Sequence, residues 1–135
     1  MYNITIKVST LFVFVLFLTI GCSSQKNNPI SSFEPEVINN ADAFQFQITD
    51  ATNVSTTLTY QWENTGAQAT VDHSTALLTG SATVEVRDAD SVQVYSSNLL
   101  ASGTDASLSG TSGTWFVKVV FSDFDGTVNF TIEKL

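Results

Sequence analysis

A chain of 135 residues has room for one domain, and a hydrophobic content of 43% with 11% aromatic residues is enough to build a core. The 13 acidic residues against 5 basic ones give a formal net charge of −8, and such a surface repels phosphate backbones, which argues against nucleic acid as a partner. The single cysteine excludes an internal disulfide.

The chain begins with the pattern of a secretory signal. Lys7 and the amino terminus precede an apolar run over residues 8–20. At 13 residues this run is shorter than the about 20 residues that a membrane-spanning helix needs. It ends on Gly21-Cys22, and polar residues follow directly. We therefore predict that residues 1–21 are a signal peptide.

The end of this run, LTIGC, resembles the lipobox of bacterial lipoproteins, which is cut before a cysteine that carries acyl chains such as palmitate; Thr19 stands where the strict pattern has Leu. The resemblance implies that Cys22 is the first mature residue and that its lipid anchors the protein to a membrane. Because Ser23 is not Asp, the familiar sorting rule for such proteins implies the outer membrane. The predicted location is the bacterial cell envelope.

A linker is predicted over residues 22–41. Its sequence is rich in Ser and Asn and contains both prolines, Pro29 and Pro35, as a flexible tether does. Within it, Val37-Ile38 is a candidate edge strand. The folded domain is predicted to occupy residues 42–135.

From Ala43 onward apolar and polar residues alternate with a period of two, which indicates β-strands. The segment around Trp115 is apolar on both faces and is predicted to be a central strand. The longest predicted loop covers residues 98–113. The predicted strand segments are 44–48, 57–63, 69–72, 82–87, 92–95, 115–121 and 127–133.

No segment after the linker has a helical stripe, so the expected fold is all-β. About seven or eight short strands, each with one wet face, favour an antiparallel β-sandwich of the jelly-roll-like kind. A closed barrel is the alternative.

Asp72, His73 and Ser74 are adjacent and invite comparison with a catalytic triad. In a strand, however, neighbouring side chains point to opposite faces, so these three cannot form the relay. We interpret His73 as a strand-end residue near solvent, and we predict no catalytic residue in the chain.

Two Asp-x-Asp pairs, Asp88 with Asp90 and Asp123 with Asp125, are candidate calcium ligands. If the two turns came together, with Asp105 nearby, their oxygens would make a weak calcium site. The alternative is that these residues serve the turns, which Asp favours.

Four aromatic residues could form a stacking platform for a sugar: Tyr60, Trp62, Tyr95 and Trp115. Trp62 and Trp115 are in phase with apolar strand positions, which favours a place in the core. Tyr95 is out of phase with Val92 and Val94, and we predict an exposed, ligand-binding ring there.

The segments GTWFVKV (113–119) and GTVNFTI (126–132) resemble the ending of bacterial pre-peptidase C-terminal domains, and residues 80–95 resemble their middle. The resemblance implies a compact β-sandwich of the kind attached to secreted enzymes, with a role in substrate binding and, in some members, bound calcium. Glu85 replaces the family's usual Asp-Leu in the middle strand, so no calcium ligand carries over.

These features predict a non-catalytic envelope lipoprotein, not an enzyme. Its sandwich would serve as a binding or accessory module for a glycan, peptide or protein partner. The alternative is a structural or assembly subunit that pairs an exposed sheet edge with another envelope protein. No cofactor is predicted apart from the calcium considered above.

Overall fold

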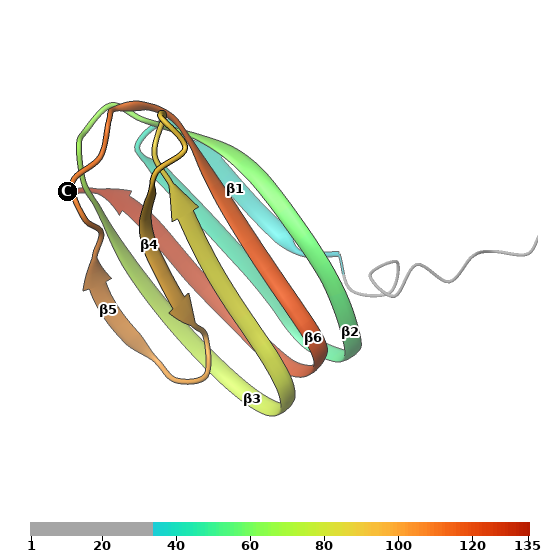
Figure 1. Ribbon diagram of the computed structural model, residues 1–135. Coiled ribbons are helices and arrows are strands. Elements are labelled where there is room, and N and C mark those ends of the chain that lie inside the picture. The colour runs from blue at the N-terminus through green and yellow to red at the C-terminus, as the bar shows by residue number, and fades with distance from the viewer. Residues whose placement is uncertain (1–33) are drawn as a thin grey trace, which may run out of the picture.

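The computed structural model describes residues 34–135, except for the side chains of Leu77 and Leu78. The predicted signal peptide and Cys22 lie outside the described residues. All neighbouring strands pair antiparallel (Figure 1). The strands are β1 (Glu36–Asn40), β2 (Ala43–Asn64), β3 (Ala69–Arg87), β4 (Gln93–Asn98), β5 (Gly103–Ala106) and β6 (Gly113–Lys134).

The three long strands bend sharply at mid-length, so that one sheet folds over into two layers (Figure 1). Register shifts mark the bend between Ile48 and Thr56 in β2 and between Leu77 and Ser81 in β3. Gly80, at φ 78°, lies at the bend. An added Cβ there would lie 2.1 Å from the carbonyl oxygen of Asp123 on β6, so this close approach requires glycine.

Layer one has the strand order β1-β2-β6-β3-β5 and contains the first halves of β2 and β3 with the second half of β6. Layer two has the order β2-β6-β3-β4 and contains the other halves. Six of the seven predicted segments are thus paired halves of three continuous strands, and the predicted β-sandwich is confirmed. The edge strands β1 and β4 do not pair, so the described sheet is open and is not a closed barrel.

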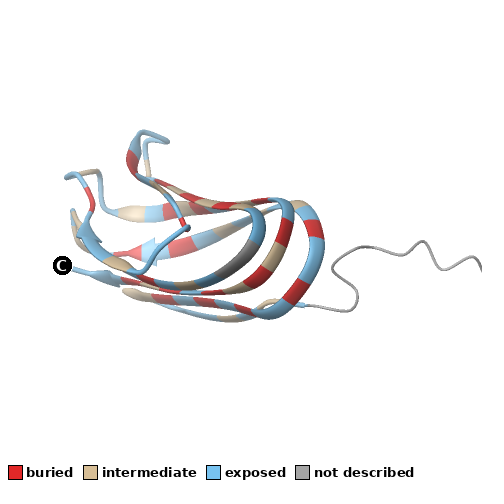
Figure 2. Cartoon of the chain, turned by 90° about the horizontal axis from the view of Figure 1, so that it is seen from below, coloured by how far each residue is buried: buried red, intermediate tan, exposed pale blue. Residues whose placement is uncertain are grey.

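The core lies between the layers, and buried residues alternate with exposed ones along the strands (Figure 2). The rings of Phe46 and Phe130 stack with centroids 5.0 Å apart. Trp62 and Trp115, paired across β2 and β6, are fully buried and meet edge to face at 5.8 Å, which confirms their predicted place in the core. Strand β6 lies between β2 and β3, as its two apolar faces predict.

The sheet begins earlier than the predicted domain boundary at residue 42. Residues 36–40 form β1 and pair with β2, which confirms the candidate edge strand at Val37-Ile38. Strand β5 lies within the segment predicted as the longest loop and pairs with β3. Both are short edge strands with mostly exposed residues, so neither shows the apolar alternation on which the prediction relied.

Candidate functional site

The first predicted calcium pair, Asp88 and Asp90, lies in the turn between β3 and β4. Asp88 is only 3% exposed, and its carboxylate accepts hydrogen bonds from the backbone N–H groups of Asp90, Val92 and Thr111 at 2.8–3.1 Å. These bonds, that from Thr111 above all, lower the pKa of Asp88 although desolvation opposes them. The Asp90 carboxylate accepts the Thr111 hydroxyl at 2.6 Å. The hydrogen bonds of both carboxylates therefore stabilise the turn and its contact with Thr111.

The second pair, Asp123 and Asp125, lies in the bend of β6. Asp123 accepts a hydrogen bond from the Ser55 hydroxyl at 3.1 Å. Asp125 accepts the Thr79 hydroxyl and the backbone N–H of Asn53, and these bonds lower its pKa, the one from Thr79 most. This pair joins the bends of the three long strands to one another.

The two pairs do not come together. One lies at the loop end of the sandwich and the other at its bent end (Figure 1), and the nine residue steps from Thr79 in β3 to Asp88 just after it span roughly 30 Å of extended chain. Within residues 34–135 no group of three or more His, Cys, Asp or Glu residues is placed to hold a metal ion. The arrangement favours the structural interpretation of both pairs.

Tyr95 is not the exposed ring that the sequence predicts. The residue is 9% exposed, and its buried hydroxyl makes no hydrogen bond within residues 34–135. The reason is a bulge: Val86 pairs with Tyr95 but Arg87 pairs with Gln93, so Val94 is an extra residue in β4. The bulge shifts the alternation by one position, and both Val94 and Tyr95 are buried.

His73 is also more buried than predicted. It lies inside β3 rather than at a strand end, is 6% exposed, and packs against Gly103 of the neighbouring β5. Asp72 and Ser74, on either side of it, are exposed on the outer surface of layer one. The alternation that argued against a catalytic triad is therefore confirmed.

The outer surface of layer one carries a continuous array of polar side chains that sequence reasoning did not assemble. Cross-strand pairing sets these side chains in two rows across β1, β2, β6 and β3. We call this array the polar face, and it consists of Glu36, Gln45, Gln47, Asp72, Ser74, Asn129 and Thr131.

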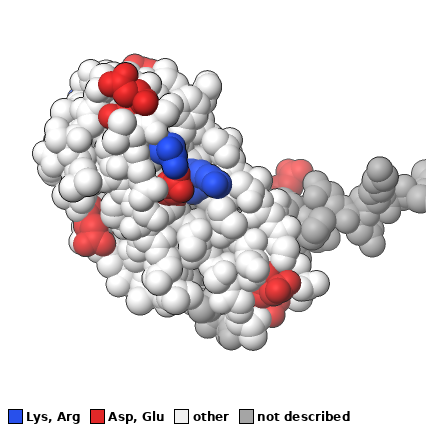
Figure 3. Space-filling model, in the orientation of Figure 1, with Lys and Arg blue, Asp and Glu red and all other residues white. Residues whose placement is uncertain are grey.

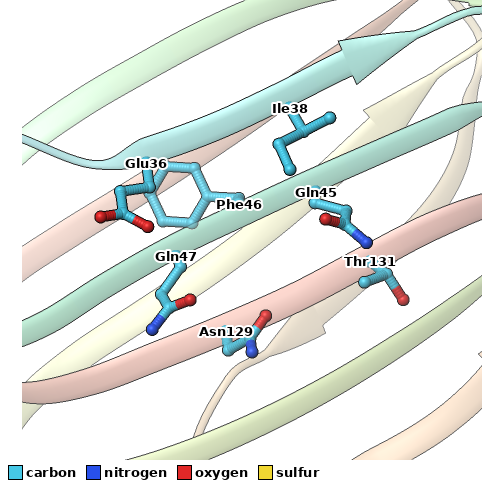
Figure 4. A pocket seen from close by; sticks show the side chains of 7 residues that line it. All are labelled: Glu36, Ile38, Gln45, Phe46, Gln47, Asn129 and Thr131. Carbon is cyan, nitrogen blue, oxygen red and sulfur yellow. The ribbon is translucent and has the colours of Figure 1, made fainter.

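The polar face contains two adjoining hollows. One, of about 150 Å³, lies over β1, β2 and β6 and is shown in Figure 4 with the ring of Phe46 at its floor. The other, of about 190 Å³, lies over β6 and β3. Asn129 and Thr131 line both. The hollows therefore form one shallow groove that runs across the strands.

The side chains of the polar face make few hydrogen bonds within the described part of the protein. Within residues 34–135 their one side-chain hydrogen bond runs from Gln47 to the Thr49 hydroxyl, at 3.1 Å. Amides and hydroxyls both donate and accept hydrogen bonds, so the groove offers both functions to a ligand. This differs from the ends of the sandwich, where Asp88 and Asp125 bond within the protein.

No family model matches the chain, and no curated protein matches it. Among solved structures, the chain is similar to part of the Glycosylation Associate Protein (Gap123) complex from Streptococcus agalactiae, at 12% identity and a TM-score of 0.39. The match covers 78% of this chain and 40% of the other. At that TM-score the likeness carries no argument about function. Among residues 34–135, no helix combines the length and the apolar character needed to cross a bilayer.

Proposed function

We propose that the protein is a non-catalytic lipoprotein of the bacterial cell envelope, anchored through Cys22, whose polar face binds a neutral glycan. The polar face is the observation that carries the proposal. A glycan presents many hydroxyl groups that donate and accept hydrogen bonds, and the amides of Gln45, Gln47 and Asn129 provide the complementary functions in one groove.

The two carboxylates that line the hollows are too far apart to act as a glycosidase pair. Glu36 and Asp72 are the two carboxylates of the polar face. They lie on β1 and β3, separated by β2 and β6, which corresponds to about 14 Å at the usual strand spacing. The two carboxylates of a glycosidase are about 5–9.5 Å apart. The pair is therefore too widely spaced for that mechanism.

The predicted anchor fits this role. A chain of about 14 residues from Cys22 to Glu36 would have a root-mean-square span of about 20 Å if flexible. Such a tether would hold the sandwich near the membrane while its groove stays accessible to envelope glycans. Replacing Cys22 with Ala should move the protein from the membrane fraction to the soluble fraction. Retention in the membrane fraction would contradict the anchor.

An array of neutral oligosaccharides, probed with the purified full chain, tests the binding proposal. We expect binding that Asn129→Ala weakens about three- to ten-fold, because Asn129 lines both hollows and each lost hydrogen bond is worth about 0.5–1.5 kcal/mol. Thr57→Ala, at an exposed position of layer two outside both hollows and the cationic patch, is the matched control and should bind normally. An array without any neutral binder, or equal binding by Asn129→Ala, would refute the proposal.

A second candidate function is assembly through the sheet edge. Among the described strands β1 pairs only with β2, so within residues 34–135 the backbone groups on its other side have no partner, and Ile38 beside them is 55% exposed. Pairing of this edge with another envelope protein would make the chain a structural subunit. Crosslinking in cells tests this: a partner lost on Ile38→Pro supports it, and a strict monomer without crosslinks speaks against it.

A further inference from the structure

The outer surface of layer two carries the densest group of basic side chains in the described residues. Figure 3 shows basic and acidic groups side by side in the middle of this surface. Cross-strand pairing brings Phe116 beside Arg87 and Lys118 beside Glu85. These residues, with Thr59 and Ser91, line a hollow of about 250 Å³. We call the group Arg87, Lys118, Phe116 and Glu85 the cationic patch.

The charge of the patch is unusual for this chain. Residues 34–135 contain all 13 acidic residues but only three basic ones, and two of those three are in the patch. The third, Lys134, is paired with Asp42 at 2.7 Å. The only other ion pair of the described residues joins Arg87 to Glu85, so Lys118 has no acidic partner there. The acidic surface elsewhere repels an anion, whereas the two basic side chains of the patch attract it.

The position of the Arg87 guanidinium in the patch is preorganised for binding. The Arg87 guanidinium donates hydrogen bonds to the Glu85 carboxylate and, at 3.0 Å, to the carbonyl oxygen of Ser91. These bonds fix the position of the cation before a ligand arrives, which reduces the entropy lost on binding. Lys118, across the strands from Glu85, supplies a second cation, which makes no ion pair within the described residues.

An aromatic ring lies between these charges. Phe116 is half-buried, and it is the one phenylalanine of residues 34–135 that is not buried in the core. A ring at a sheet surface offers an apolar face to a flat ligand. The hydroxyl of Thr59 and the carboxylate of Glu85 lie around it as hydrogen-bond acceptors.

We propose that the cationic patch binds a carboxylated sugar, a hexuronate unit of an acidic polysaccharide. Arg87 and Lys118 bind the sugar carboxylate, Phe116 packs against the apolar face of the sugar ring, and Glu85 accepts hydrogen bonds from the sugar hydroxyls. An acidic peptide fits less well, because Glu85 would repel its carboxylates without receiving hydroxyl donors in return.

This second site goes beyond the proposed function. The polar face and the cationic patch lie on opposite outer surfaces of the sandwich. A negative result for binding at one surface therefore does not decide whether the other surface binds its ligand. Loss of neutral-glycan binding alone would refute the first proposal and leave the second intact.

Calorimetric titration of the full chain with trigalacturonate at low ionic strength tests the proposal. The methyl ester of trigalacturonate serves as the uncharged control ligand. We expect trigalacturonate to bind at least ten-fold more tightly than the ester. Lys118→Gln should weaken binding about ten-fold, because a charge-assisted hydrogen bond is lost. Lys134→Gln removes the same charge away from the patch and should change binding less than two-fold.

Three results would overturn the proposal. The first is equal binding of the acid and its ester, or no binding of either. The second is an equal loss in Lys118→Gln and Lys134→Gln, which would mean that net charge alone acts. The third is equally tight binding of a pentaglutamate peptide, which would mean that the patch selects acidic peptides instead. Phe116→Leu provides a further check and should weaken trigalacturonate binding while the chain keeps its melting temperature within about 3 °C.

Discussion

The two outer faces of the sandwich are built from the same three long strands, yet they present different chemistry. On layer one, β6 turns Asn129 and Thr131 outward; on layer two, the same strand turns Phe116 and Lys118 outward. Because the sheet bends between the layers, the two halves of each strand have separate outer surfaces. A strand that crosses both layers can therefore contribute to two outer surfaces of different chemistry, one rich in amides and hydroxyls and one with two basic side chains.

The largest loss of stability is expected for a substitution that disrupts the bend of the long strands. Gly80→Ala would place a Cβ 2.1 Å from the Asp123 carbonyl oxygen at a positive φ, so we expect a loss of at least about 2 kcal/mol in the free energy of unfolding. Urea denaturation measures it. Gly103→Ala is the control, because its Cβ would make ordinary contact with His73 at 3.4 Å. Equal stability of the two variants would contradict the role of Gly80.

The Asp88 carboxylate at the loop end should make the stability of the fold depend on pH. Bonds in the folded state lower the pKa of Asp88 below its ordinary value of 3.8, which the unfolded chain retains. A lowered folded-state pKa contributes stability above the unfolded value, and this stability is lost as the pH falls through the folded-state value. The melting temperature should therefore drop below about pH 4, and Asp88→Asn should show a smaller drop. An identical drop in both proteins would contradict this role.

The strands, the core and the two-layer fold could be predicted because alternation is a local property. Trp62 and Trp115 were in phase with their apolar neighbours, and both are buried. Tyr95 was predicted wrongly because a bulge changes the phase without any mark in the sequence. The polar face and the cationic patch could not be predicted, because residues such as Arg87 and Lys118, which are far apart in the chain, become neighbours only through strand register.

A smaller change in the free energy of unfolding is expected for Tyr95, which lies inside the sandwich and on neither outer face. The buried Tyr95 hydroxyl makes no hydrogen bond within residues 34–135, so Tyr95→Phe removes an unsatisfied group and should leave the free energy of unfolding unchanged or raise it by up to about 1 kcal/mol. Urea denaturation measures the change. A loss of more than about 1 kcal/mol would mean that the hydroxyl is hydrogen-bonded in solution.

The smallest effect is expected for calcium. The Asp88 and Asp125 carboxylates are already engaged by hydrogen bonds within the protein, so millimolar calcium should leave the melting temperature unchanged. Differential scanning calorimetry with calcium and with a chelator makes the comparison. A rise in the melting temperature that Asp88→Asn or Asp125→Asn abolishes would restore the calcium interpretation of that pair.

The most direct test of two separate binding surfaces is a crossed titration. The full chain, Asn129→Ala and Lys118→Gln are each titrated with trigalacturonate and with a neutral oligosaccharide that binds on the array. We predict that Asn129→Ala loses affinity only for the neutral sugar and Lys118→Gln only for trigalacturonate. Loss of both ligands in either variant, or of neither ligand in both, would contradict the account.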